Sequence, residues 1–236
     1  MSGKTNKEIT IAVTCIGSGV AQSIVNSLRS SSLNTRLVGL GNNIFAFGLY
    51  DCDVHDYLPG IYSDDYIAQL LKQCQEHHVD ILLPGLDDDA HIISRSADRF
   101  REQGIEVLVS DADLVSVCRD KVKICNLLHE VTDSFCESFT RENYRGALDC
   151  GKLHYPFIAK PADGSGSQGV KIINDESFLH LIEANACVQE LVAPRPDDPC
   201  AGEFWKQVER HVVSQVSEVS VEIVTSRNGE LIGRMA

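Results

Sequence analysis

The chain has 236 residues, with 34 acidic and 21 basic side chains and a net charge of −13. Hydrophobic residues make up 43% and charged residues 23%, close to a globular average, which excludes a disordered tail, a collagen-like chain and a disulfide-rich miniprotein. The length predicts one large or two small domains, and the acidic balance argues against a broad basic surface for nucleic acid.

The cysteine pattern indicates a reducing compartment. The chain has nine cysteines, an odd number, and no Cys-x-x-Cys pair, so we expect reduced structural thiols rather than disulfides or a zinc site. Residues 1–8 are polar and lack the apolar core of a signal peptide. No apolar run reaches the ~20 residues of a membrane span. We therefore expect a cytoplasmic protein with no membrane partner.

Residues 1–115 alternate between strand and helix patterns. Short apolar runs at 9–14, 36–40, 79–83 and 105–109 predict strands. Helical spacing appears between them at Ala21 to Leu28, at Tyr66 to Cys74, and in one helix carrying Ile93, Ala97 and Phe100. This rhythm predicts parallel βαβ units and an α/β, Rossmann-like sheet domain.

Residues 116–192 have a different rhythm and read as an α+β lobe. A helix is expected at 120–130, and strands at 156–160 and 169–173 flank a glycine- and serine-rich loop, which predicts a hairpin. Asn174 or Asp175 is a cap for a helix carrying Phe178, Leu179 and Ile182, and a strand follows at 186–192.

The last part of the chain is less regular. Residues 193–217, rich in proline at their start, read as an insertion or linker in which Phe204, Trp205, Val208 and Val212 form a short amphipathic helix. Residues 218–236 alternate, turn at Asn-Gly and alternate again, which predicts a hairpin. A lone hairpin cannot bury its apolar face, so we interpret 218–236 as the start of an incomplete second lobe.

The turn Gly17-Ser18-Gly19 follows the first strand. Two glycines there allow backbone N–H groups to approach an anion at a helix N-terminus. The dinucleotide fingerprint is incomplete, because Gln22 occupies its third glycine position and no acidic residue follows the second strand. Two alternatives are stronger than NAD binding. One is a tight turn without a ligand, and the other is a contact of Gly17 and Gly19 with a small substrate.

Asp87, Asp88 and Asp89 follow the third predicted strand at the sheet edge where ligands of open α/β sheets bind. We weigh two roles for them: substrate or cation contacts, for which Asp87 and Asp88 are the candidates, and a solvated N-terminal cap of the next helix. The histidines lack a third partner at metal-ligand spacing, so no metal site is expected in the chain.

A second glycine-rich loop spans residues 163–169, directly after Lys160. Its mobile backbone is able to fold over a polyphosphate, and Lys160, at the end of the preceding strand, reaches phosphate oxygens as a point charge. Lys121 opens a helix, the strand at 188–192 offers main-chain groups to an adenine edge, and Glu218 offers a carboxylate to ribose. These residues, in this order along the chain, predict a nucleotide-binding cleft.

These residues resemble the ATP-grasp superfamily, and most of all its carbamoyl-phosphate-synthase-large-chain-like branch. The resemblance rests on Asp120-Lys121, on Tyr-Pro-Phe-Ile-Ala-Lys-Pro at 155–161, on Gly-Ser-Gly-Ser-Gln-Gly at 164–169, and on Glu-Val-Ser-Val-Glu at 218–222 followed by Asn-Gly-Glu-Leu. In the N-terminal part, residues 79–84 and 87–89 resemble a segment of the pre-ATP-grasp domain.

The resemblance implies a ligase that phosphorylates a carboxylate with ATP and Mg²⁺ and then joins it to an amine or similar nucleophile. It implies a small-molecule carboxylate substrate and, at the level of the family, a homodimer. The ATP-binding residues that it implies are Lys121, Lys160, Gly164, Ser165, Gly166, Ser167, Gly169, Glu190, Leu191, Val192 and Glu218.

Two departures from the family pattern matter. The stretch 193–217 separates the adenine strand from Glu218 by more than the usual link. The family's magnesium ligands are expected beyond residue 236, so we expect a fragment of a longer protein that does not turn over ATP by itself. A non-catalytic nucleotide-binding or assembly module is the alternative from another class, and a Rossmann-type oxidoreductase is a third.

Overall fold

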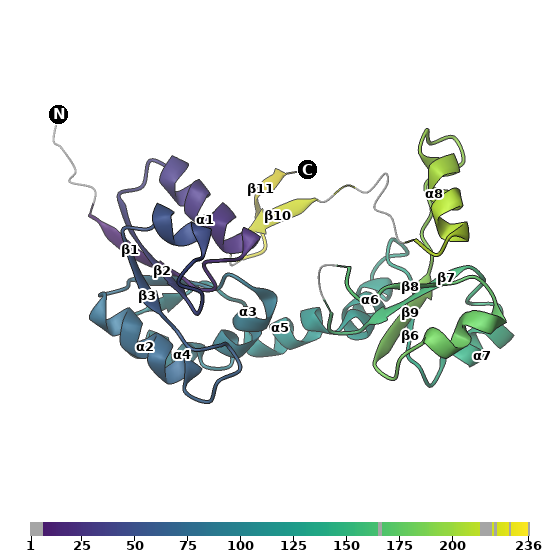
Figure 1. The fold of residues 1–236 in the computed structure, drawn as a ribbon, viewed down its shortest axis with the longest axis horizontal. Helices are drawn as coiled ribbons and strands as arrows, with labels where there is room; N and C mark the ends of the chain where they lie inside the picture. Colours follow the sequence, from purple (N-terminus) through teal and green to yellow (C-terminus); the bar gives the residue numbers. More distant parts are fainter. Residues whose placement is uncertain (1–6, 165–166, 213–218, 220, 227, 236) are drawn as a thin grey trace. The chain divides into compact units, whose positions relative to one another are not determined.

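The computed structural model describes residues 7–164, 167–212, 219, 221–226 and 228–235. The chain divides into two units, Met1–Arg119 and Asp120–Ala236, each of which we describe by itself (Figure 1).

Unit 1 is built on a parallel sheet with the strand order β3-β2-β1-β4-β5. Its strands are β1 (Ile9–Val13), β2 (Thr35–Gly41), β3 (Val54–Tyr57), β4 (Ile81–Leu83) and β5 (Glu106–Val107). The four predicted strands are present. Strand β3 was not predicted, because it is short, lies at the sheet edge, and none of its residues is buried, so its sequence shows little apolar patterning.

Helices cover both faces of this sheet. They are α1 (Gly19–Ser30), η1 (Phe47–Asp51), α2 (Tyr66–Glu76), α3 (Asp87–Ser94), α4 (Ala97–Arg101) and α5 (Ala112–Arg119). Alternate residues of the strands face opposite sides: Ala12 packs with α2, α3 and α4, whereas Ile11 and Val13 pack with α1 and η1. Figure 1 shows α1 on one face and α2 with α4 on the other.

The prediction of one helix carrying Ile93, Ala97 and Phe100 is wrong in its continuity. Helix α3 ends at Ser94, Ser96 leaves the helical region with a φ of −121°, and α4 begins at Ala97. The buried side chains are nevertheless those expected, because both short helices bury apolar residues in the same cluster.

The sheet has its topological switch point between β1 and β4. The chain leaves β1 for β2 and β3 on one side and returns to β4 and β5 on the other, so the connections that follow β1 and β4 lead to opposite sides of the sheet. The first residues of the two loops nevertheless lie close together: a Cβ on Gly85 would collide with the carbonyl oxygen of Thr14 and lie 2.9 Å from Ala21 Cβ. Only glycine fits this approach without a shift.

Unit 2 contains an antiparallel sheet with the order β6-β9-β7-β8. Its elements are α6 (Lys121–His129), β6 (Ser138–Phe139), α7 (Tyr144–Asp149), β7 (Phe157–Pro161), β8 (Lys171–Ile173), η2 (Glu176–Leu181) and β9 (Ala186–Glu190). The predicted β7–β8 hairpin is present. The helix expected after Asp175 is a 3-10 helix, and Asp175 caps it by accepting from Ser177 N.

The remaining part of unit 2 holds helix α8 (Ala201–Glu209) and the antiparallel pair β10 (Glu222–Thr225) and β11 (Leu231–Met235). The amphipathic helix expected in 193–217 is confirmed: Phe204 and Val208 are buried against Ile172 of β8. The expected hairpin is also present, and its first strand begins at Glu222. No helix in the described part of the chain has the length and apolar character to cross a membrane.

Candidate functional site

The sheet of unit 2 has one face in the core and one face that carries polar groups. Phe157 and Ala159 of β7 belong to the core cluster, which also receives residues of α7 and η2. Pairing partners in antiparallel strands project to the same side, so Lys160 shares the opposite face with Cys187, its partner in β9. The strand pattern thus sets Lys160 on the polar face, at the end of β7 that leads into the glycine-rich loop.

Lys121 and Lys160 converge on one thiol of this face. Burial raises the pKa of the Cys187 thiol, and Lys160 and Lys121 each act against this shift and lower it. Cys187 is fully buried, so both ammonium groups lie close enough to influence a thiol below the surface of the face. Lys121 also bonds to Ala162, the residue that follows β7, and Lys160 lies near the end of β7, so two lysines 39 positions apart in the sequence form one electropositive spot at this end of the strand.

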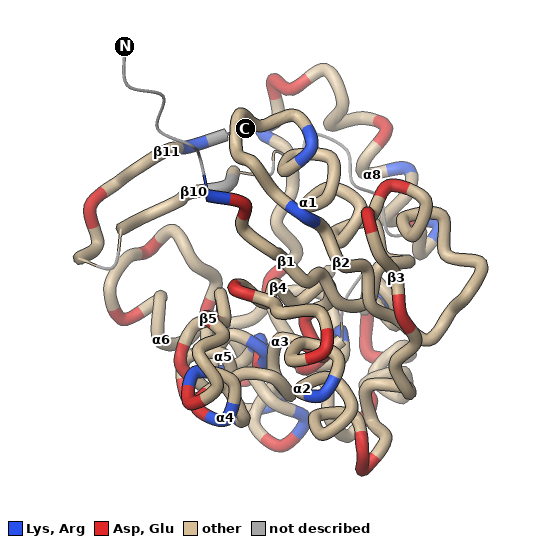
Figure 2. The backbone as a smooth tube through the Cα atoms, turned by 90° about the vertical axis from the view of Figure 1, so that its left-hand side faces the viewer, with Lys and Arg blue, Asp and Glu red and all other residues tan. Residues whose placement is uncertain are grey.

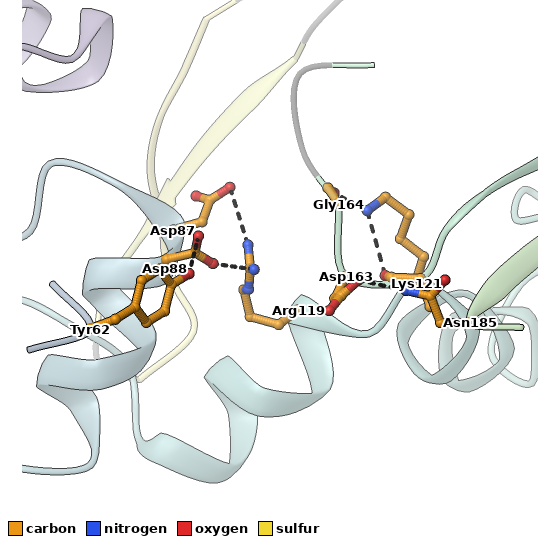
Figure 3. A network of polar contacts seen from close by, with 9 residues as sticks. Tyr62, Asp87, Asp88, Arg119, Lys121, Asp163, Gly164 and Asn185 are labelled. Carbon is orange, nitrogen blue, oxygen red and sulfur yellow. Dashed lines mark hydrogen bonds and ion pairs between the residues drawn. The ribbon is translucent and has the colours of Figure 1, made fainter. Parts of the chain in front are cut away.

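Lys121 is tied to the glycine-rich loop. Its backbone N–H donates to Ala162 O at 2.9 Å, and its ammonium donates to the carbonyl oxygens of Gly164 and, at 3.5 Å, Ala162. Asp120 caps α6 by accepting from Val122 N at 3.0 Å, which orients the start of the helix. The right-hand part of Figure 3 shows Lys121 reaching Gly164. By contrast, within the described residues no hydrogen bond or ion pair holds the ammonium of Lys160.

The loop itself has backbone conformations that favour glycine. Gly169 has a φ of +72°, and Ser167 has a φ of +56°. A Cβ on Gly169 would lie 2.9 Å from Pro161 Cγ, so the loop closes tightly on the end of β7. Gly164 accepts from Lys121, and Ser165 and Gly166 lie outside the described residues.

The predicted adenine residues lie at the end of β9, which pairs with β7. Burial is the main cause that raises the pKa of the Cys136 thiol. Glu190 raises this pKa further, and Lys160 lowers it. Glu190 and Val192 are exposed, and Leu191 is half-buried against the α8 cluster. Glu190 pairs with Phe157 at the start of β7, whereas Lys160 lies near the end of this strand, so the predicted adenine residues lie toward the opposite end of β7 from Lys160. Their contact with adenine stays a prediction. Glu218, the predicted ribose ligand, lies outside the described residues.

Several residues that build this face were not singled out from the sequence. Asn126 on α6 donates to Ser138 O at 3.0 Å and accepts from Ser138 N at 2.8 Å, which fastens α6 to β6. Gln189 is buried and donates to Ser138 Oγ at 2.6 Å. The polar pair Gln189-Glu190 inside an apolar strand was the only sequence signal for the group, and it does not identify Asn126.

In unit 1, Asp87 and Asp88 are engaged by protein side chains. Arg119 at the end of α5 forms an ion pair with Asp88 and a longer contact with Asp87, and Tyr62 Oη donates to Asp88 at 2.8 Å (Figure 3, left). Their position in the first turn of α3 also favours negative charge. Their predicted contact with substrate stays a prediction.

Asp89 corrects the expectation of a solvated cap, since it is fully buried. Its carboxylate accepts from the hydroxyl of Thr14 and from Tyr66 Oη at 2.6 Å, and Cys15 Sγ approaches to 3.6 Å. Burial raises the pKa of Asp89, although these donors and Gly85 N–H act to lower it. Burial also raises the pKa of the Cys15 thiol to about 12, which leaves that thiol unreactive.

A pocket of about 480 Å³ lies at the carboxyl edge of the unit 1 sheet. The loops after β1, β2, β3 and β4 enclose it, and Gly17 is part of its wall. Gly19, Asp87 and Asp88 do not line it. The pocket lining is Cys15, Ile16, Gly17, Ser18, Gly41, Asn42, Asn43, Ala46, Leu58, Pro59, Ile61, Tyr66 and Leu86.

The described residues contain no group of three or more His, Cys, Asp or Glu side chains able to hold a metal ion. Figure 2 shows acidic and basic positions interleaved in α4, whereas α3 begins with three consecutive aspartates.

The chain is similar to known proteins in two ways. Residues 11–108, most of unit 1, match the family model of the PylC-like N-terminal domain. No curated protein sequence matches the chain.

Solved structures resemble a larger part of the chain. N5-carboxyaminoimidazole synthetase from Staphylococcus aureus, solved with ADP, has a TM-score of 0.61 and 14% identity over 96% of this chain and 69% of its own. The biotin carboxylase domain dimer of Hydrogenobacter thermophilus 2-oxoglutarate carboxylase was solved with ADP, magnesium and bicarbonate. It has a TM-score of 0.55 and 14% identity, over 78% of this chain and 44% of its own. L-amino acid ligase from Bacillus licheniformis has a TM-score of 0.53 and 15% identity, over 80% of this chain and 45% of its own.

At these identities the likeness shows the fold. It confirms the predicted fold class, an α/β Rossmann-like parallel sheet domain followed by an α+β lobe. The chain spans less than half the length of the latter two proteins.

Proposed function

We propose that this chain, which has the fold of the ATP-grasp superfamily, is the ATP-binding portion of an ATP-dependent ligase. The ligase would activate a small-molecule carboxylate as an acyl phosphate and pass the acyl group to an amine or similar nucleophile. The similar proteins named above include a synthetase and an amino acid ligase, and two of the three were solved with ADP.

One observation carries the proposal: the Lys121 ammonium donates to Gly164 O of the glycine-rich loop, and Lys160 lies on β7 directly before that loop. A triphosphate needs concentrated positive charge, and lysine supplies it as a point charge. The whole chain is strongly acidic, with a net charge of −13, so such a spot stands out from its surroundings. Among the described residues the Lys160 ammonium has no hydrogen bond or ion pair, so phosphate oxygens would not have to displace a protein partner.

The predicted site residues suggest a division of roles. Lys160 and Lys121 would bind phosphate oxygens, and the 164–169 loop would fold over them with its backbone N–H groups. Main-chain groups of Glu190 to Val192 would meet adenine, and Glu218 would bind ribose. The proposal assigns no step to a magnesium ion.

The chemistry follows from the poor reactivity of a carboxylate. A carboxylate oxygen attacks the γ-phosphorus of ATP, the bond to the β-phosphate oxygen breaks, and ADP leaves with the electron pair. The nucleophile then attacks the acyl carbon, and inorganic phosphate leaves in turn. Lysine ammonium groups at the phosphates stabilise the charge on the transferred phosphoryl group.

The first test is the affinity for ATP, measured by isothermal titration calorimetry on the whole chain. We expect Lys160→Met to weaken ATP binding about ten- to a hundredfold, because a charge-assisted hydrogen bond contributes about 1.5–3 kcal/mol. Lys152→Met is the matched control: it removes the same charge in the same unit, but from an exposed lysine paired with Glu137. Equal affinities of wild type and Lys160→Met would refute the site.

A further inference from the structure

The pocket at the carboxyl edge of unit 1 has no role in the nucleotide proposal. Its volume of about 480 Å³ falls in the range of small-molecule sites, about 300–1,000 Å³. Loops that follow four different strands form its wall, and they meet at the switch point of the sheet. Ligands of open α/β sheets bind at this place.

The wall is mainly apolar and uncharged. Its lining includes the apolar residues Ile16, Ala46, Leu58, Pro59, Ile61 and Leu86. None of the described residues that line the pocket is a Lys, Arg, His, Asp or Glu. An anion would have to leave water there without a counter-ion, which is costly, whereas an apolar group gains from burial.

The start of α1 does not replace the missing cations. Ser18 Oγ accepts from Ala21 N at 2.9 Å and donates to Gly85 O at 2.7 Å. The side chain thus occupies one of the N–H groups that would otherwise be offered to a ligand anion, and its own hydroxyl proton is also committed. Ser18 N–H is also used, because it donates to Cys15 O at 2.8 Å, so two of the N–H groups at this turn are bound by the protein itself.

The pocket nevertheless has a polar contact point at the end of β2. Asn42 is exposed, and its carboxamide has no hydrogen-bond partner in the described part of the chain. The neighbouring Asn43 uses its Oδ1 to accept from Phe45 N at 3.0 Å. A carboxamide presents one acceptor and two donor hydrogens, so Asn42 is able to bind an amide, a hydroxyl or an amine N–H of a ligand.

The frame of the pocket is rigid. Tyr66 lines it and is itself 2% exposed, with its hydroxyl held by buried Asp89. Thr14 accepts from Gly85 N at 3.2 Å and donates to the same carboxylate. These buried bonds connect the loops after β1 and β4 and the start of α2, so the cavity is formed without a ligand.

We propose that this pocket binds an uncharged, mainly apolar small molecule that carries one group able to hydrogen-bond to Asn42. The proposal excludes phosphorylated ligands and dinucleotides from the pocket. It goes beyond the nucleotide site and does not rest on it, since the two sites share no residue.

Two fluorescent dyes that differ by one sulfonate test the proposal on the whole chain. N-phenyl-1-naphthylamine is neutral and has one N–H, and 8-anilinonaphthalene-1-sulfonate is its anionic counterpart. We expect the neutral dye to bind at least about tenfold more tightly, because the pocket has no cation for the sulfonate. We expect Asn42→Lys to reverse this preference, because it places an ammonium at the rim.

A filling variant locates the bound dye. Leu86 lines the pocket and is 43% exposed, so Leu86→Trp is expected to fold and to weaken the neutral dye at least about tenfold. Leu33→Trp is the matched control, because Leu33 is 51% exposed in the same unit and does not line the pocket. Equal binding of both dyes to wild type, or neutral-dye binding that neither Leu86→Trp nor Asn42→Lys changes, would overturn the proposal. Unchanged dye binding in Lys160→Met would show that the result is independent of the nucleotide site.

Discussion

At the scale of residues, identical side chains have different states that depend on their partners. The three consecutive aspartates at 87–89 begin the same helix, yet Asp88 pairs with Arg119 whereas Asp89 is buried with Thr14 and Tyr66. Lys121 donates to loop carbonyls, and Lys160 carries no such bond among the described residues. Residues of one type in one motif therefore differ in the protein contacts that a ligand would have to displace.

The buried Asp89 predicts a pH dependence of stability. Burial raises its pKa in the folded protein, so folding favours the protonated acid. This contribution is fully present below the unfolded pKa of about 3.9 and is lost as the pH rises through the higher folded value. We expect the free energy of unfolding of wild type, relative to Asp89→Asn, to fall as the pH rises above about 4, measured by urea unfolding at each pH.

Asp53→Asn is the control with the opposite sign. Burial acts to raise the pKa of Asp53, but hydrogen bonds from Arg29 and Leu37 N–H outweigh it and lower the pKa. Its contribution is present above the unfolded pKa and is lost as the pH falls through the folded value. Wild type should therefore gain stability relative to Asp53→Asn as the pH rises. Parallel pH curves of wild type and Asp89→Asn would contradict the role given to Asp89.

At the scale of elements, helix α8 shows how an added segment attaches to a sheet. Its apolar stripe packs on Ile172 of β8, the strand that leaves the glycine-rich loop. Asn174, just after β8, donates to Val208 O at 3.2 Å, and Phe178 stacks near His211 with ring centres 4.2 Å apart. The helix is thus held both by apolar packing and by polar contacts at its end.

This packing predicts the effect of a single truncation. Phe204→Ala should lower the free energy of unfolding by about 3 kcal/mol, because it removes a buried aromatic ring and leaves a cavity. Trp205, the only tryptophan of the chain, lies on α8, so its fluorescence follows the loss of this helix in urea. Lys206→Ala on the exposed side is the control, expected within about 0.5 kcal/mol of wild type. Equal midpoints for the two variants would show that α8 does not pack through Phe204.

At the scale of the whole molecule, the chain has separate cores in its two units. The clusters of buried residues around Leu82 and around Val13 belong to unit 1, and those around Phe157 and Ile172 belong to unit 2. Among the described residues, none of these clusters combines side chains from both units. Each unit therefore contains its own apolar core, as independently folding domains do.

Separate cores predict separate responses to destabilisation. Leu82→Ala should speed amide hydrogen exchange in unit 1, and Phe157→Ala should speed it in unit 2, because each change removes a fully buried side chain from one core. Hydrogen exchange with mass spectrometry reads out both units in one experiment. Equal acceleration in both units by either variant would show that the two cores unfold as one.

The elements and the fold class could be predicted because they depend on local patterns. Strand runs, helical stripes and the Asn-Gly turn each lie within a few residues of sequence. The β7–β8 hairpin follows from two strand patterns that flank the glycine-rich loop. The edge strand β3 and the break between α3 and α4 could not be predicted, because half-buried residues and a helix end at Arg95 leave no strong pattern. The polar cluster of Asp89 depends on partners 23 and 75 positions away.

The sequence by itself determined most of the order of elements, the resemblance to ATP-grasp proteins and the residues expected at the nucleotide. Composition argued against a broad basic nucleic-acid surface, and the spacing of apolar residues predicted which faces are buried. Only the tertiary structure decided which aspartate is buried, that Gly17 but not Gly19 borders a pocket, and that this pocket lacks charge. The physical reason is that side-chain environment depends on which loops meet at a sheet edge, and those loops are far apart in the chain.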